Sequence, residues 1–300
     1  MAQTLELLTH RTETMRSIRG IVRTMKTMSA INARPYEQAA QAIGAYRETV
    51  LSGFHAFMHS HGALPLGDEK DAVPVIIAFG SDHGLCGNYN EVLAREVAQA
   101  FAAQAGDGAQ GTRLICVGAQ MEDALTGLDL TPEVTLMPPA SADGLGRLAG
   151  RLITRLDGIR MAARSGAISV MLVFMQRAAH GQQLAVCQRL LPMDPDLIAE
   201  LAARPWASRS LPSYRLPPEQ VLAALIRSYL FTDLFAAAAE ALVTENAARL
   251  ARMQQAEQSV DDQLEELTGE MRAVRQDEIT TELMDVIIGF EALKKRDRRK

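Results

Sequence analysis

One unbroken stretch near the C-terminus, residues 218–293, constrains this chain more than any other feature. It has no proline after Pro218 and no glycine except Gly269 before Gly289, and it is rich in Ala, Glu, Leu, Arg and Gln, which are strong helix formers. A continuous helix of this length would extend roughly 100 Å, because an α-helix rises 1.5 Å per residue. Since that exceeds the reach of a compact domain, the stretch predicts a long helix that needs a partner along its length.

The apolar residues within this stretch follow the spacing of a coiled coil. Steps of four, three, four and three residues separate Val260, Leu264, Leu267, Met271 and Val274. This is the narrow seam of a heptad repeat rather than the broad apolar face of an ordinary amphipathic helix. We therefore expect a second helix to pack against it.

The N-terminal residues 1–60 are the natural partner. They are predicted to be helical, with apolar side chains every three or four residues. Residues 11–34 carry six basic residues and one acidic residue, whereas residues 257–285 carry ten acidic and two basic residues. Opposite charges and matching stripes predict an antiparallel pair, although two solvated charged faces are the alternative. Pro35 either bends or ends the first helix. The predicted stripe consists of Leu8, Met15, Ile18, Ile21 or Val22, Met25, Met28, and Ile31 or Asn32.

The middle of the chain, residues 73–192, alternates buried strands with helices. Strands are predicted at 75–79, 114–117, 134–137, 168–175 and 184–190, with helices at 91–104, 121–125 and 145–161. This alternation predicts a Rossmann-like, mostly parallel α/β domain inserted between the two helices of the coiled-coil shaft. The fold class is therefore α/β plus a long coiled coil. The expected parts are 1–60, 73–192, a proline-rich extended connector at 193–217, the helix 218–293 and a basic tail at 294–300.

Composition excludes several classes of protein. The chain has 31 Lys and Arg against 36 Asp and Glu, which argues against a general nucleic-acid binder. Its three cysteines form no CxxC pair, which fits a reducing compartment without disulfides. The first residues lack the pattern of a signal peptide, and no run reaches the roughly 18 apolar residues of a membrane span. We expect a soluble chain.

The sharpest local motif is the turn at 80–90, Gly-Ser-Asp-His-Gly-Leu-Cys-Gly-Asn-Tyr-Asn. It follows a strand and precedes a helix, where phosphates often bind. However, it matches neither GxGxxG nor GxxxxGK[ST], so a structural turn with Asn90 capping the next helix is favoured over nucleotide binding. Asp82, His83 and Cys86 lack a further ligand or orienting partner for metal binding or catalysis. His55, His59 and His61 are expected to be solvated histidines rather than metal ligands.

Three stretches resemble motifs of the gamma subunits of F-type ATP synthases. They are residues 21–30 (IVRTMKTMSA), residues 81–90 (SDHGLCGNYN), and residues 245–256 with their continuation at 275–283 (RQDEITTEL). Their order and intervals cover nearly the whole chain. His83 replaces the arginine of the family turn, and Asp277-Glu278 replaces small residues. The turn residues that match the family are Ser81, Asp82, Gly84, Cys86, Gly87 and Asn90.

The resemblance implies a non-catalytic central-stalk rotor that couples ion-driven rotation of a ring of c subunits to conformational change in catalytic beta subunits. It implies alpha, beta, epsilon and c-ring partners, no cofactor or metal, no nucleic acid, and a peripheral place on the cytoplasmic face of a bacterial inner membrane. Arg275, Gln276 and Met25 match family residues that contact a beta subunit. The departures from the motifs suggest a divergent branch, in which the coupling ion is H⁺ or Na⁺.

Two other classes of function remain open on the sequence. One is a stand-alone nucleotide-binding α/β enzyme with helical arms. The other is a coiled-coil adaptor whose basic tail binds nucleic acid or a membrane.

Overall fold

The computed structural model describes residues 2–62, 64, 72–105, 111–179, 182–206, 209–210 and 212–297. The chain divides into two compact units. Residues 1–28 and 250–300 form the first, which we call the two-helix unit, and residues 29–249 form the second, which we call the sheet unit. The side chains of the expected basic tail, residues 294–300, lie outside the described residues.

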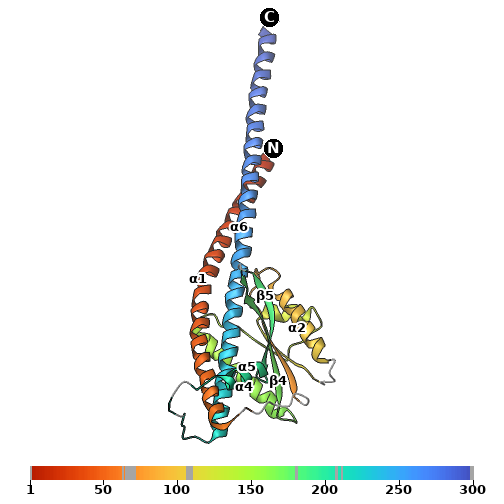
Figure 1. The fold of residues 1–300 in the computed structure, drawn as a ribbon. Helices are drawn as coiled ribbons and strands as arrows, with labels where there is room; N and C mark the ends of the chain where they lie inside the picture. The colour runs from red at the N-terminus through yellow and green to blue at the C-terminus, as the bar shows by residue number, and fades with distance from the viewer. Residues whose placement is uncertain are drawn as a thin grey trace. The chain divides into compact units, whose positions relative to one another are not determined.

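Two helices, α1 (Ala2–His61) and α6 (Pro218–Asp297), supply both segments of the two-helix unit. Thr12 of α1 lies 3.4 Å from the sulfur of Met271, and Arg19 Nε lies 2.7 Å from Asp261 Oδ1. Since residue numbers rise on α1 as they fall on α6, the helices are antiparallel (Figure 1). The core of the predicted α6 seam is buried, which confirms the coiled-coil prediction; it consists of Val260, Leu264 and Leu267.

The buried face of α1 is narrower than the predicted stripe. Leu8, Thr12 and Val22 are buried, whereas Ile18 and Ile21 are 38% and 60% exposed. The prediction was wrong for Ile18 and for Met28, which is 55% exposed, whereas of the pair Ile21 or Val22 it is Val22 that is buried. Apolar spacing of three and four residues fits two neighbouring faces of one helix, and α6 covers only one of them. The described part of the chain therefore leaves a second apolar face of α1 uncovered.

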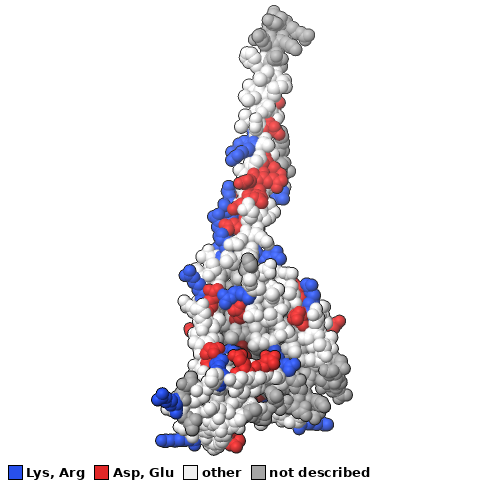
Figure 2. Space-filling model, viewed as in Figure 1, with Lys and Arg blue, Asp and Glu red and all other residues white. Residues whose placement is uncertain are grey.

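Opposite charges also join the two helices. The Glu257 carboxylate accepts hydrogen bonds from Lys26 and Arg23, the latter at 2.7 Å. These two cations lower the pKa of the Glu257 carboxyl below its ordinary value. Basic and acidic side chains lie next to one another along this part of the molecule in Figure 2. The predicted charge pairing is confirmed.

Helix α1 passes through Pro35 without ending. Proline lacks the N–H that would bond to the carbonyl four residues earlier, so one backbone bond of the helix is lost there. Pro35 is exposed, so water can reach the freed carbonyl. Of the two possibilities left open by the sequence, termination at Pro35 is wrong.

The sheet unit is built on five strands in the order β3-β2-β1-β4-β5. Strands β1 to β4 are parallel, and β5 runs antiparallel to β4. This confirms the mostly parallel α/β sheet. The strand bounds are β1 (Val73–Phe79), β2 (Arg113–Val117), β3 (Val134–Leu136), β4 (Ile168–Arg177) and β5 (Gln183–Leu191).

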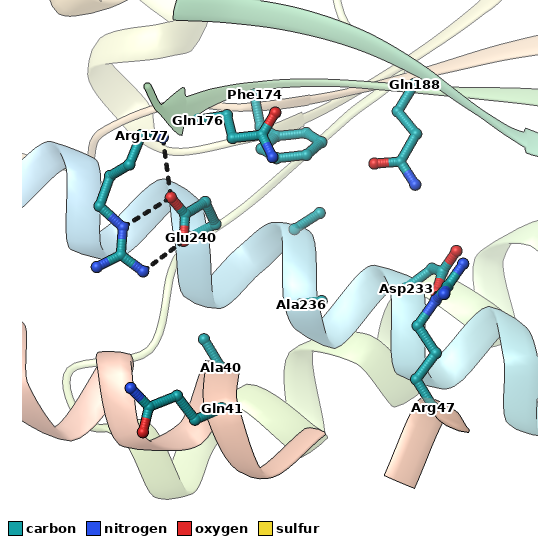
Figure 3. Close-up of a pocket in the computed structure, with 11 residues that line it drawn as sticks. Ala40, Gln41, Arg47, Phe174, Gln176, Arg177, Gln188, Asp233, Ala236 and Glu240 are labelled. Carbon is teal, nitrogen blue, oxygen red and sulfur yellow. Dashed lines mark hydrogen bonds and ion pairs between the residues drawn. The ribbon is translucent and has the colours of Figure 1, made fainter. Parts of the chain in front are cut away.

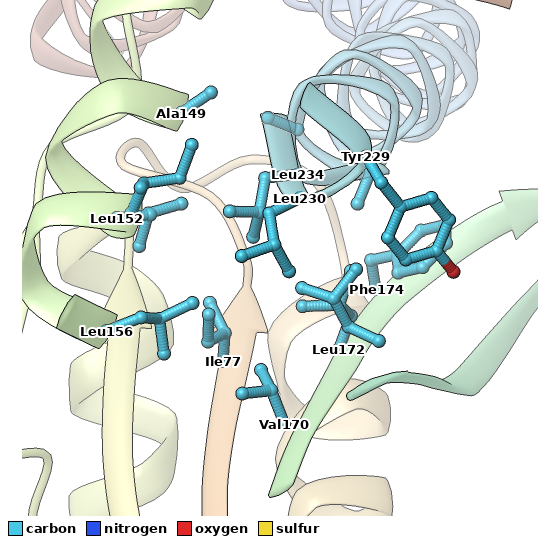
Figure 4. Packing of buried hydrophobic residues seen from close by; sticks show 14 of the residues in the cluster. Ile77, Ala149, Leu152, Leu156, Val170, Leu172, Phe174, Tyr229, Leu230 and Leu234 are labelled. Carbon is cyan, nitrogen blue, oxygen red and sulfur yellow. The ribbon is translucent and has the colours of Figure 1, made fainter. Parts of the chain in front are cut away.

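Helices cover both faces of this sheet (Figure 1). The α2 (Tyr89–Ala105) and α3 (Ala119–Thr126) helices pack on the face that carries Ile76 and Ala78. The other face carries Ile77 and packs against α4 (Leu145–Ala162), α1 and α6. Figure 4 shows its core, where side chains from α4, α6 and the strands interlock. Among them are Leu152, Leu156, Leu172, Leu230 and Leu234.

Part of α6 is apolar enough, by length and composition alone, to cross a bilayer. An 18-residue window within it has a mean hydropathy of 1.5, and 39% of that window is buried in this structure. Because Leu230 and Leu234 of α6 belong to the core against the sheet, packing explains much of this apolar character.

The expected extended connector contains a helix, α5 (Pro195–Ala203). The Asp194 side chain accepts a hydrogen bond from the Asp196 N–H at 3.0 Å, so it caps the first turn. The prediction of extended chain was wrong here because an N-cap Asp followed by Pro at the first helical position starts helices. A short 3₁₀ turn, η1 (Ala142–Gly144), precedes α4.

Candidate functional site

A doubly wound sheet binds ligands beyond the carboxyl ends of its strands, where the strand order reverses. In this sheet that point lies between β1 and β4, because the chain continues from β1 to β2 on one side while β4 lies on the other. The turn at 80–90 directly follows β1. The sequence motif therefore lies where a ligand site would be expected.

The turn is held from inside by Asn90. Its Oδ1 accepts a hydrogen bond from the Ser81 N–H at 2.9 Å, and its Nδ2 donates to Ser81 Oγ at 2.8 Å. The Cys86 sulfur lies 3.5 Å from the same hydroxyl. Asn90 was expected to cap the next helix, but α2 already begins at Tyr89, so that expectation was wrong. Gly87 has a φ of +71°, a backbone conformation that glycine adopts easily.

Helix α6 closes the turn from outside. Arg249 donates from Nη2 to the His83 carbonyl at 3.1 Å and from Nε to the Gly84 carbonyl at 3.3 Å. The same Nη2 lies 2.6 Å from Glu245 Oε1. The side chains of Arg249 and Glu245 are only 12% and 6% exposed, so this is a buried ion pair that also binds two backbone carbonyls.

Burial sets the protonation of this cluster. It raises the pKa of the Glu245 carboxyl, an effect that the neighbouring Arg249 opposes. Burial likewise raises the pKa of the Cys86 thiol and of the Tyr89 hydroxyl. A thiol with a raised pKa stays protonated and is a poor nucleophile.

The catalytic alternative is disfavoured by the same geometry. His83 is exposed while Cys86 is buried, and Asp82 Oδ2 lies 3.8 Å from His83 Nε2. The turn thus brings its Asp and His within ion-pair range but turns the thiol away into the core. Neither a general base acting on Cys86 nor a completed triad is formed by these three residues.

The protein's own side chains fill the expected ligand crevice. Tyr89 donates from its hydroxyl to the Ala241 carbonyl at 2.9 Å, and Thr244 Oγ1 donates to the Met175 carbonyl at 3.3 Å. Gln183 of β5 donates to the Thr244 carbonyl at 2.9 Å. Helix α6 therefore lies where a nucleotide would sit on a doubly wound sheet, which argues against the enzyme alternative.

A groove of about 460 Å³ lies among α1, α6 and the β4-β5 pair (Figure 3). Arg47 Nε lies 2.7 Å from Asp233 Oδ1, and Arg177 Nε lies 2.9 Å from Glu240 Oε1. Both cations are thus matched by carboxylates across the groove. This pairing ties α1 and β4 to α6 and is typical of a structural contact rather than of a reactive site.

Of His55, His59 and His61 near the end of α1, only His55 is buried, whereas His59 and His61 are exposed. His55 is 8% exposed, with Nε2 2.9 Å from the Arg204 carbonyl, and the His59 ring stacks on Trp206 at 5.2 Å. The expectation of solvated histidines was wrong for His55, because Arg204 and Trp206 lie over that end of α1. Within the described part of the chain, no three His, Cys, Asp or Glu side chains are placed to hold a metal ion.

Arg275, Gln276 and Met25, which match family residues that contact a beta subunit, lie in the two-helix unit. They lie at two separate heights along its length. Arg275 and Gln276 are exposed on α6, and Met25 is half-buried on α1. Lys26, the neighbour of Met25, pairs with Glu257. Because Glu257 and Arg275 are 18 residues apart on one helix, the two levels are about 27 Å apart.

The α6 segment beyond Arg275 carries an uncovered apolar surface that the predicted heptad seam does not include. Val286 and Phe290 are 69% and 68% exposed. Their crowding in the sequence Val-Ile-Ile-Gly-Phe was a signal for it, since a solvated helix end is normally polar. The other exposed apolar residues there are Ile279, Leu283, Met284, Ile287 and Ile288.

Comparison with known proteins gives a consistent result. The family model described as ATP synthase matches residues 4–293. An ATP synthase gamma chain of Nitratidesulfovibrio vulgaris (strain Miyazaki F) is 32% identical over 238 residues, covering 78% of each chain. The ATP synthase gamma chain of Dinoroseobacter shibae is 27% identical and covers 96% of this chain and 99% of that one.

Solved structures share the fold. The rotor of Euglena gracilis mitochondrial ATP synthase aligns with a TM-score of 0.60 at 13% identity, over 93% of this chain and all of that one. The central stalk and c-ring structure of Tetrahymena thermophila mitochondrial ATP synthase gives a TM-score of 0.52 over 79% of this chain. The family match over nearly all residues and the two gamma-chain relatives show that this chain belongs to the ATP synthase family, as one of its gamma chains.

Proposed function

We propose that this gamma chain is the rotor of a bacterial F-type ATP synthase or ATPase, coupling rotation of a c-ring to conformational change in catalytic beta subunits. Gamma chains are non-catalytic central-stalk subunits, and the filled crevice of this sheet is consistent with that role. The uncovered apolar surface of the two-helix unit carries the proposal.

Exposed apolar surface on this scale needs an enclosing partner. Ile18 and Ile21 on α1 and the α6 segment from Ile279 to Phe290 expose large side chains that no part of the described chain covers. Soluble monomers rarely leave such patches open, and a rotating contact favours apolar surfaces because they have no fixed hydrogen-bond partners to break. We infer that a ring of alpha and beta subunits surrounds this surface.

Two contacts with a beta subunit, one polar and one apolar, are part of the proposal. Arg275 and Gln276 bind a loop of one beta subunit, and Met25 touches beta at the lower level on α1. A guanidinium can form two parallel hydrogen bonds with one carboxylate, so Arg275 suits an acidic loop. We further infer that the α/β domain, rather than the two-helix shaft, contacts the epsilon subunit and the c-ring.

The proposed setting is the one that the family resemblance implies. The complex carries H⁺ or Na⁺ across the bacterial inner membrane, and the chain lies peripherally on its cytoplasmic face. The alternative function is that of a coiled-coil adaptor whose basic tail binds nucleic acid or a membrane. Salt-sensitive binding of the purified chain to DNA or anionic vesicles would favour that adaptor over the rotor.

Co-purification tests the proposal. A tagged full-length chain expressed in its native host and extracted from membranes should bring alpha and beta subunits with it, in equal amounts to each other. A variant with Ile18, Ile21 and Phe290 changed to Ser should recover less alpha and beta while keeping its own fold by circular dichroism. Recovery of the chain alone, with nucleotide turnover by it, would contradict the rotor and support the enzyme.

A further inference from the structure

Arg249 occupies a special place in the chain. It is the last residue of the sheet unit, and Leu250 begins the α6 segment of the two-helix unit. No loop separates the units there, because α6 is continuous across this boundary. A twisting force on the α6 segment beyond Leu250 can therefore enter the sheet unit directly, through the helix backbone and the side chains that fix it.

We propose that Arg249 is a positioning residue for energy coupling, because it fastens α6 to the turn at residues 81–86 at the point where torque passes from helix to sheet. The proposal rests on the rotor function above and assigns a mechanical role to the family turn, which that function leaves unexplained.

The planar guanidinium of Arg249 presents several N–H donors at once. Its Nε and Nη2 bind the carbonyls of Gly84 and His83, while Nη2 also bonds to Glu245. Glu245 lies one turn earlier on α6 and holds the guanidinium in place, since both side chains are buried. A lysine ammonium is a single point of donation and cannot reproduce this planar set of contacts.

The other side of the turn is tied to two strands. The Gly80 N–H at the end of β1 bonds to the Val117 carbonyl of β2 at 2.9 Å. The Gln120 N–H of α3 bonds to the Ser81 carbonyl at 3.1 Å. Hydrogen bonds at both ends of the turn, joined by its own backbone, therefore link Arg249 to β2 and α3.

Helix α1 is fixed further from its own boundary. The sheet unit begins at Ser29 on α1, and Tyr36, seven residues later, donates from its hydroxyl to the Pro139 carbonyl at 3.0 Å. Helix α6 is thus fastened at the last residue of the unit, while this α1 contact lies two turns inside it. A charged side chain thus fixes α6 at the boundary itself, whereas the hydrogen bond of Tyr36 fixes α1 two turns away from it.

Hydrogen exchange on the isolated full-length chain tests the fastening directly. Arg249→Gln removes the charge and the fork, and Arg252→Gln is the matched control, because Arg252 lies on the same helix and bonds only to Gln255. Backbone amides of residues 82–88 should exchange about tenfold faster in R249Q, the effect of losing hydrogen bonds to a charged group. The exchange rates of backbone amides in β1 and β2 should be the same as in the wild-type chain. Equal exchange of residues 82–88 in R249Q and R252Q would overturn the proposal.

The assembled complex tests the coupling role. Ions pumped per ATP hydrolysed should fall severalfold with R249Q, less with R249K, and stay at the wild-type value with R252Q. A purely structural role would lower assembly and leave this ratio unchanged, which would overturn the proposal. If R249Q does not fold, R249K in both assays gives the same comparison. Failure of the chain to recover alpha and beta subunits would instead contradict the rotor function itself.

Discussion

Individual polar residues join parts of the sheet unit that are far apart in the sequence. Tyr89 reaches the Ala241 carbonyl, and Arg249 reaches the carbonyls of His83 and Gly84. In each case a buried donor finds a backbone acceptor, and a buried donor left without one would be costly. These residues explain why a motif without catalytic chemistry still requires particular residue types.

The Glu245–Arg249 pair predicts a pH-dependent loss of stability in Arg249→Gln. Without Arg249, burial raises the pKa of the Glu245 carboxyl further. The folded state then favours the protonated acid, so the variant is most stable below the unfolded value of about 4.3 and loses stability as pH rises from there. We expect a deficit of about 3 kcal/mol at neutral pH, shrinking towards pH 4.

Denaturant unfolding of the full chain from pH 4 to pH 8 measures this effect. The double variant Glu245→Gln with Arg249→Gln is the control, because it has no buried carboxyl to titrate and should show a flatter difference from wild type. A deficit in R249Q that is constant with pH would contradict the assigned cause.

Gly118 is predicted to be irreplaceable for a backbone reason. Its φ is +107°, and a Cβ at this position would lie 2.4 Å from the Ser81 carbonyl oxygen. Gly118→Ala should therefore destabilise the chain by at least about 1–3 kcal/mol, measured by denaturant unfolding. Gly158→Ala is the matched control, since Gly158 lies within α4 with nothing within 4 Å of its Cβ position. It should be neutral or stabilising by up to about 1 kcal/mol.

At the scale of helices and strands, the pairing of α1 with α6 combines an apolar seam with charge. Val260, Leu264 and Leu267 supply the seam, and Glu257 meets Arg23 and Lys26 beside it. Apolar contact gives most of the free energy of such a pair, whereas exposed ion pairs mainly set register and orientation.

Acid should weaken this pairing through Glu257. Because Lys26 and Arg23 lower the pKa of its carboxyl, the contribution of the ion pairs is fully present above about pH 4.3 and is lost as pH falls through the lowered value. Glu257→Gln should thus lower the melting temperature at pH 6 but make little difference near pH 2. Glu265→Gln, on the exposed side of the same helix, is the control and should change it little at either pH. An equal effect of Glu257→Gln at both pH values would contradict the role of charge.

At the scale of the whole molecule, the chain has two units with different surfaces. In the sheet unit, the protein's own side chains fill the ligand crevice. In the two-helix unit, the apolar surface is exposed. Both features suit a subunit that transmits force and leaves catalysis to its neighbours. The polar residues among that apolar surface are then the places where specific contact with those neighbours is expected.

Arg275→Ala should uncouple the complex without unfolding the chain. Arg275 is exposed on α6, so the fold loses little when it is removed. ATP-driven ion pumping in membrane vesicles should fall severalfold if the guanidinium binds a carboxylate of beta. Arg272→Ala, three residues earlier and also exposed, is the matched control. Pumping equal to wild type in the Arg275 variant would contradict the assigned contact.

The sequence by itself determined the elements and their pairing. Heptad spacing at Val260 to Val274, opposite charge at the two ends of the chain and buried apolar strands such as 75–79 are local patterns, and local patterns suffice for helices, strands and a coiled coil. Family motifs added the function. The stripe on α1 was assigned only in part, because periodicity shows which residues share a face but not which face a partner covers.

Only the tertiary structure decided what the turn at 80–90 does. Its partners, Glu245 and Arg249, lie more than 150 residues away, and hydrogen bonds between such distant residues leave no periodic trace in a sequence. The same holds for His55, which the sequence left in solvent and the fold buried beneath the connector. Burial of a polar group is a property of packing, so it is settled when distant segments meet and not before.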